Sequence, residues 1–157
     1  MIKAILSDFS GTILFLKDKD SKDGLNALHE RLKDNVDYDI WDHFVLGEDI
    51  LNFHKNIASQ VDVYIFTTRY IQEWPPLKEK MAGIFKDVFS TARLNLLPKT
   101  DSQVYTMLAD KIGVKPNEII FIDDRVEHVA AAKEAGLVAI HFESESQSIR
   151  EIKKRLI

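Results

Sequence analysis

The stretch "ILSDFSGTIL", from Ile5 to Leu14, decides the fold of this chain. A short apolar run ends at Asp8, and a Ser-Gly-Thr turn follows before the chain becomes apolar again. Open parallel sheets bind ligands at the carboxyl ends of their strands, so a carboxylate at this position is a candidate for chemistry. The residue two places after Asp8 is Ser10 rather than a second acid.

Further segments resemble this first run, because they are short, rich in β-branched residues and nearly continuous in apolar character. They are Ile2–Ser7, Val61–Phe66, Glu118–Ile122 and Leu137–Phe142, with Asp87–Ser90 as a weaker candidate. Strands that are apolar on both faces are typical of a parallel sheet covered on both sides. Apolar stripes at helical spacing lie between them. The alternation predicts an α/β fold, a three-layer Rossmann-like sandwich with a mainly parallel sheet.

The stretch from Lys17 to Ala58 interrupts this alternation. It opens with the charged segment "KDKDSKD" and continues as two or three predicted helices that carry Trp41 and Phe44, with no convincing strand. We therefore expect one domain over residues 1–157 with a small helical insertion at 17–58. Farther along, the Pro-Pro pair in "EWPPLKEK" predicts a helix start with a packed Trp74, although Trp74 at a site entrance is an alternative.

Composition limits the classes of function. The chain has 157 residues, of which 45% are hydrophobic and 29% charged, and this fits one globular domain. The formal net charge of −4 argues against a nucleic-acid partner, and the lack of cysteine excludes disulfides and thiol catalysis. The sequence shows neither a signal-peptide pattern nor an apolar run of membrane-spanning length. We expect a cytoplasmic protein without a membrane partner.

Chemically capable residues follow the predicted strands. They are Asp8, the pair Thr67 and Thr68, the pair Asp123 and Asp124, and Lys99 ahead of a predicted helix. This set suits phosphoryl transfer, because Mg²⁺ prefers one or two carboxylates together with phosphate oxygens and waters.

Asp8 and Asp124 could supply the carboxylates, and Asp8 could attack phosphorus to form an aspartyl-phosphate. Thr67 could donate a hydrogen bond to the phosphate, and Lys99 could neutralise charge. Gly11 allows the backbone to turn tightly and approach the phosphate.

Each of these residues also has an ordinary interpretation when it is taken alone. An aspartate after a strand is commonly a turn or helix-cap residue, a threonine can form a turn, and a lysine is usually on the surface. The five histidines are scattered without the spacing of a metal site, so we expect each to be structural or exposed. Only the set as a whole, at corresponding strand ends, favours a site.

The sequence resembles the haloacid dehalogenase (HAD) superfamily of hydrolases in four motifs, in the family's order. "ILSDFSGTIL" matches the first motif, D-x-D-G-T after a strand, and "VYIFTTR" matches the second, a strand that ends in Ser or Thr. "LPKTDSQVY" carries the lysine of the third, and "IIFIDDRVEHVAAAKEAGL" matches the acidic pair and following helix of the fourth.

The resemblance implies a role for each matched residue. Asp8 would be the nucleophile and a Mg²⁺ ligand, and Ser10 would offer its backbone carbonyl to the metal. Asp124 would be the second metal carboxylate, with Asp123 as a ligand or its supporting partner. The phosphate would be bound by Gly11, Thr67, Thr68 and Lys99. Residues 17–58 would form a small cap, which fits an open site, a bulky substrate or a lid completed by another subunit, in a monomer or a homodimer.

Ser10 departs from the family pattern, where a second acid protonates the leaving group and later activates water. A serine hydroxyl is too weak an acid for this task near neutral pH. Three hypotheses remain open: a substrate such as an acyl phosphate, a dehalogenase-like enzyme, or a non-catalytic phosphate binder. The retained acidic pair favours a Mg²⁺-dependent phosphatase that acts on a small phosphorylated molecule.

Overall fold

The computed structural model describes residues 1–157 and contains a five-stranded parallel sheet. In spatial order its strands are β5 (Asp87–Ser90), β4 (Asp62–Thr67), β1 (Ala4–Ser7), β6 (Ile119–Asp123) and β7 (Val138–His141). This confirms the predicted α/β fold with a parallel sheet. All five predicted strands are present, with boundaries that differ by no more than two residues.

The central strand β1 is bonded on both sides, and its register sets the position of the first motif. Ser7 lies opposite Ile65 of β4 and Ile122 of β6. The next backbone N–H, that of Asp8, donates to the carbonyl of Ile122 at 2.8 Å. Asp8 therefore leaves the sheet beside the end of β6, where Asp123 is the last strand residue.

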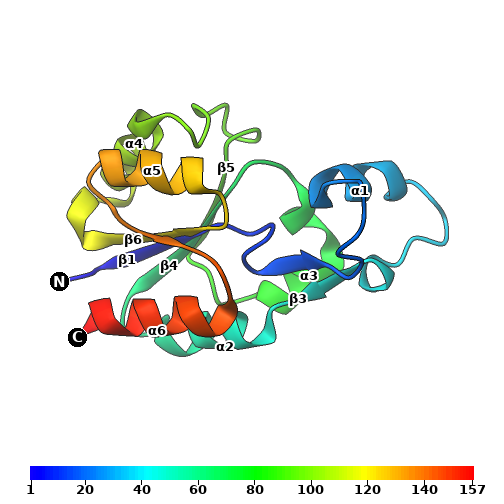
Figure 1. The fold of residues 1–157 in the computed structure, drawn as a ribbon, viewed down its shortest axis with the longest axis horizontal. Helices are drawn as coiled ribbons and strands as arrows, with labels where there is room; N and C mark the ends of the chain where they lie inside the picture. The colour runs from blue at the N-terminus through cyan, green and yellow to red at the C-terminus, as the bar shows by residue number, and fades with distance from the viewer.

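Helices cover both faces of the sheet and form the three predicted layers (Figure 1). On one face lie α4 (Ser102–Ile112) and α5 (Val126–Glu134), and on the other lie α2 (Glu48–Ile57) and α6 (Glu145–Leu156). Alternate strand residues enter two separate cores. Ile5 packs in the core that includes residues of α2 and α6, and Leu6 packs in the core that includes residues of α4 and α5. None of the helices has the length and apolar character needed to cross a bilayer.

The structure corrects one expectation for residues 17–58, namely that this stretch contains no strand. Phe44 lies in β3 (Phe44–Leu46), which pairs antiparallel with β2 (Leu14–Leu16). In addition, α2 belongs to the sandwich, because it packs alongside α6. Strands of three residues are too short to show an alternating pattern, and their pairing depends on contacts distant in the chain. The division of the chain into a domain and a cap stays a prediction.

The helix α1 (Leu25–Leu32) precedes β3 and projects beyond the sheet (Figure 1). An aromatic cluster connects it to the segment that follows β4. Nδ1 of His29 is 2.9 Å from the hydroxyl of Tyr38, and the ring of Trp74 contacts both of these rings. The helix α3 (Pro75–Met81) begins at the Pro-Pro pair as predicted. Trp74 packs against α1 in this cluster.

We predict that His54 makes the protein less stable in acid. This residue of α2 is 0% exposed, and neither ring nitrogen has a hydrogen-bond partner. Burial lowers the pKa of His54 to about 4 from an ordinary value of 6.5. Between these values the unfolded chain binds a proton that the folded chain excludes, so stability falls as the pH falls. The loss reaches about 2 kcal/mol at pH 5.

His54→Phe should therefore show a smaller loss of stability between pH 7 and pH 5 than the wild type in urea unfolding. The comparison uses the change with pH rather than the absolute stability, because the new ring also changes packing. Equal pH dependence in the two proteins would contradict this role of His54.

Candidate active site

Lys99 lies at the centre of a buried group of charges. Its side chain is only 1% exposed, and its Nζ is 3.0 Å from Oδ1 of Asp8 and 2.6 Å from Oδ2 of Asp123. Nζ also donates to the backbone carbonyl of Phe66 at 2.9 Å. The segment before α4 supplies Lys99, and the ends of β1, β4 and β6 supply its three partners. One ammonium group thus joins three neighbouring strands.

The loop after β1 is held by its own backbone. The carbonyl of Phe9 accepts bonds from the N–H groups of Ile13 and Leu14, and Gly11 N–H donates to the carbonyl of Leu14 at 2.8 Å. Gly11 has φ of +83°, a left-handed conformation that glycine adopts without strain. A Cβ atom at this position would also clash with the carboxylate of Asp124. Glycine is therefore required both by the turn and by the closeness of the fourth motif.

Both carboxylate oxygens of Asp123 are bound within the protein. Oδ1 accepts from the backbone N–H of Arg125 at 2.9 Å. Oδ2 is bound by Lys99 and lies 3.0 Å from Nδ1 of His128. These bonds outweigh the effect of burial and hold the pKa of Asp123 below its ordinary value. Asp123 therefore orients Lys99 and His128.

The carboxylates of Asp8 and Asp124 bind a proton more readily than an ordinary aspartate does. Burial raises the pKa of Asp8 to about 7, an effect that Lys99 opposes and Asp123 reinforces. The pKa of Asp124 is also raised, by burial and by the charge of Asp123. Burial by itself would lower the pKa of Lys99, but Asp8 and Asp123 together raise it, so the lysine is a cation.

The acid cluster fits a divalent cation. Ligand atoms from Asp8, Asp123 and Asp124 lie within 4.8 Å of one another. Because Asp123 is fully engaged, the oxygens of Asp8 and Asp124 are the ones left to bind a metal. Carboxylate oxygens are the ligands that Mg²⁺ takes in proteins, and the closeness of three carboxylates gives the site negative charge that a cation would offset.

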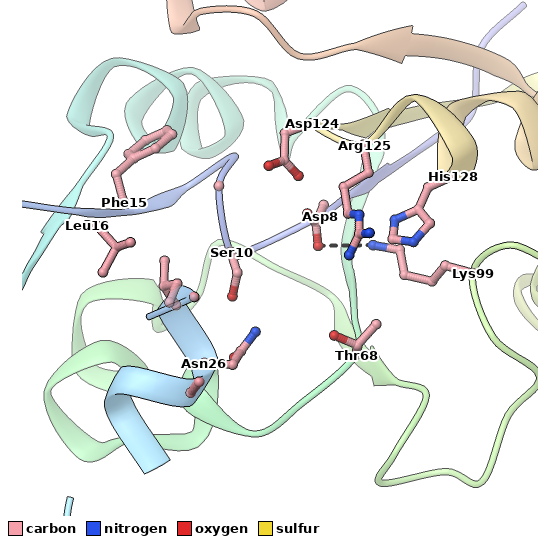
Figure 2. A pocket seen from close by; sticks show the side chains of 14 residues that line it. Asp8, Ser10, Phe15, Leu16, Asn26, Thr68, Lys99, Asp124, Arg125 and His128 are labelled. Carbon is pink, nitrogen blue, oxygen red and sulfur yellow. Dashed lines mark hydrogen bonds and ion pairs between the residues drawn. The ribbon is translucent and has the colours of Figure 1, made fainter. Parts of the chain in front are cut away.

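A cavity of about 500 Å³ opens in front of these charges. Figure 2 shows Asp8, Lys99 and Asp124 along one part of its wall, and Ser10, Asn26 and Leu16 along another. The predicted site residues that line it are Asp8, Ser10, Gly11, Thr68, Lys99 and Asp124.

Two predicted site residues do not line the cavity. Thr67 is buried at the end of β4, whereas its neighbour Thr68 faces the cavity. Asp123 is fully buried and supports the wall through Lys99 and His128. The roles of both residues remain predictions.

His128 and Asn26 are polar residues of the cavity wall that sequence reasoning missed. His128 follows Asp123 by five positions, so its place in the first turn of α5 was a usable signal for a second contact with the acidic motif. The expectation that every histidine is structural or exposed is therefore incomplete. Asn26 comes from α1, and no local pattern indicates that this helix reaches the site.

Comparison with known proteins supplies the family. The sequence model of the haloacid dehalogenase-like hydrolases matches residues 47–136, more than half of the chain. The chain belongs to the haloacid dehalogenase-like hydrolases. The matched residues include Lys99, the acidic pair Asp123 and Asp124, and the strand that ends at Thr67. The second, third and fourth motifs therefore lie inside the match.

Curated relatives of this HAD-like hydrolase are similar over parts of their length. Enolase-phosphatase E1 of Persephonella marina is 37% identical over 60 residues, which are 38% of this chain and 25% of the relative. Sesquiterpene phosphatase astK of Aspergillus oryzae is 28% identical over 96 residues, 60% of this chain and 48% of the relative. The chain thus spans less than half the length of these relatives.

Solved structures of the family share the fold. A predicted HAD-like family hydrolase from Porphyromonas gingivalis has a TM-score of 0.72 at 15% identity, covering 99% of this chain and 98% of that one. A HAD family enzyme from Bacteroides thetaiotaomicron, in complex with magnesium and inorganic phosphate, has a TM-score of 0.67 at 16% identity. That comparison covers 90% of this chain and 94% of the other.

We predict that Lys99→Met strongly destabilises this HAD-like hydrolase at pH 7, by about 3–5 kcal/mol in urea unfolding, because the buried Asp8 and Asp123 lose their cation. The matched control is Lys86→Met, which breaks the exposed pair with Asp62 and should cost far less. At acidic pH, where the carboxylates are protonated, the two variants should become more alike. Equal losses at pH 7 would contradict the central role of Lys99.

Proposed function

We propose that the chain is a Mg²⁺-dependent phosphatase that hydrolyses small phosphate esters through an aspartyl-phosphate on Asp8. The observation that carries this proposal is the position of Asp8, which faces the cavity and is paired with the buried Lys99 beside Asp124. The similarity to an enolase-phosphatase and to a sesquiterpene phosphatase supports the same type of reaction.

In the first step, a carboxylate oxygen of Asp8 attacks phosphorus. A bond forms between this oxygen and phosphorus, the bond from phosphorus to the alcohol oxygen breaks, and the alcohol leaves with the bonding electrons. Lys99 donates to Oδ1 of Asp8, so we assign the attack to Oδ2. Oδ1 has a second lone pair, with which Asp8 would bind the metal. Lys99 and Thr68 lie on the wall where the phosphate oxygens would bind, and they supply a cation and a hydroxyl donor.

The metal would be held by Asp8 and Asp124, with the backbone carbonyl of Ser10 as a further ligand. Bound Mg²⁺ supplies positive charge that offsets the repulsion between the anionic phosphate and the acids of the site. Asp123 contributes by keeping Lys99 in place.

The leaving group receives no proton from Ser10. An alkoxide must take its proton from water, and this makes hydrolysis of ordinary esters slow, whereas an acyl phosphate releases a carboxylate that needs none. In the second step, water attacks phosphorus and the bond to Asp8 breaks. Inorganic phosphate is released and the Asp8 carboxylate is restored.

The deciding experiment measures phosphate release from a panel of alkyl and acyl phosphates, with Mg²⁺ and with a chelator. We expect slow turnover that requires Mg²⁺, faster with acyl phosphates, and no turnover in Asp8→Asn. The matched control is Asp34→Asn, an exposed aspartate of the segment after α1, which should behave as wild type. Turnover that persists in Asp8→Asn would exclude Asp8 as the nucleophile.

Ser10→Asp tests the account of the slow step. The new carboxyl restores a proton donor near the leaving group, so turnover of alkyl phosphates should rise by about tenfold or more. Turnover of acyl phosphates should change much less, because their leaving group needs no proton. If turnover of neither substrate rises in Ser10→Asp, the missing acid does not limit the rate. The chain is then better described as a non-catalytic phosphate binder.

A further inference from the structure

Among the polar side chains of the cavity wall that take no part in the chemistry proposed above, two contain an oxygen atom without a hydrogen-bond partner. They are those of Ser10, in the loop after β1, and Asn26, in the first turn of α1. Figure 2 shows them pointing toward one another on the part of the wall away from Lys99. They come from segments separated by the charged stretch 17–23, and the fold brings them to the same region of the cavity.

Both side chains contain a polar atom without a partner. The Oγ atom of Ser10 and the Oδ1 atom of Asn26 are shielded from solvent, and neither forms a hydrogen bond. Buried polar atoms in folded proteins are nearly always bonded, because leaving one unpaired is unfavourable. Two such atoms at one end of a cavity indicate that a ligand group completes their bonding.

Local structure does not account for either side chain. The loop around Ser10 is held by backbone bonds, including the one from Gly11 N–H to the carbonyl of Leu14. The helix α1 begins after Gly24, and no side chain caps it. Asn26 therefore does not serve as a helix cap, and the Ser10 hydroxyl is not needed to shape the turn.

The surroundings determine which ligand group fits. Phe15, Leu16 and Leu25 provide apolar wall on this side, so they offer no hydrogen bonds. Gly11, next to Ser10, lies against the carboxylate of Asp124, which disfavours a second anionic group there. A hydroxyl group is neutral, and it can both donate to and accept from an amide and a serine.

We infer that Ser10 and Asn26 form a subsite for a hydroxyl group on the alcohol part of the substrate. This inference rests on the proposed phosphatase function, and it narrows the substrate class to phosphate monoesters of small polyols. Ser10 has a binding role here, which differs from that of the acid it replaces. The apolar side chains nearby pack against the carbon skeleton.

The test compares two substrates that differ in hydroxyl groups, glycerol 3-phosphate and propyl phosphate, in the presence of Mg²⁺. We expect wild-type kcat/KM to favour glycerol phosphate by about tenfold or more, because a site built for a hydroxyl discriminates against an analogue that lacks it. Ser10→Ala and Asn26→Ala should each reduce this ratio at least about threefold. Their kcat/KM for propyl phosphate should change much less.

The matched control is Asn35→Ala, an exposed asparagine after α1 that does not line this cavity, and its ratio should equal that of wild type. The affinities of both esters for the Asp8→Asn variant, measured by calorimetry with Mg²⁺, give the preference for glycerol 3-phosphate over propyl phosphate without turnover. The double variant Asp8→Asn, Asn26→Ala should show a smaller ratio of these two affinities.

The failures of the two proposals are distinguishable. If both esters are hydrolysed with the same ratio in wild type, Ser10→Ala and Asn26→Ala, the subsite is overturned and the phosphatase stands. If neither ester is hydrolysed but the affinity ratio depends on Asn26, the phosphatase fails and the subsite stands. If neither ester binds, both are overturned.

Discussion

The contact between Lys99 and two buried carboxylates is the constraint on which the site depends. A lysine that is 1% exposed needs anionic partners, and Asp8 and Asp123 are the ones within reach. Asp8 and Asp123 lie close together because β1 and β6 pair in the sheet, with their carboxyl ends side by side. The order of strands in the sheet therefore determines which carboxylates neutralise Lys99.

Lys99 does not neutralise the whole cluster, and this imbalance defines what the site can bind. Asp8 and Asp123 are paired with Lys99, and ligand atoms of these two carboxylates and of Asp124 lie within 4.8 Å of one another. Burial together with the charges of Asp123 and Asp124 raises the pKa of Asp8 to about 7. The backbone tolerates the closeness of Asp124 because glycine occupies position 11. The fold thus holds three carboxylates close together, and a bound cation would reduce the repulsion between them.

The cavity has a charged part and a polar part, and they come from different kinds of structure. Asp8 and Asp124 lie at strand ends of the sheet, and Lys99 lies in the segment before α4. Asn26 lies on α1, which the rings of His29, Tyr38 and Trp74 attach to the rest of the fold. The first part suits a reaction common to a family. The second depends on α1, whose place is set by side-chain packing rather than by the register of the sheet.

The sequence by itself determined the α/β class, the five strands, the acid after β1 and the acidic pair after β6, because apolar runs and strand-end residues are local signals. Ser10 was visible as a departure for the same reason. Only the tertiary structure decided that Phe44 lies in a strand, that Asp123 is saturated by Lys99 and His128, and that Thr68 rather than Thr67 lines the cavity. It also brought Asn26 to the site. These features depend on the direction of side chains and on contacts between distant segments, which residue type and spacing along one chain do not specify.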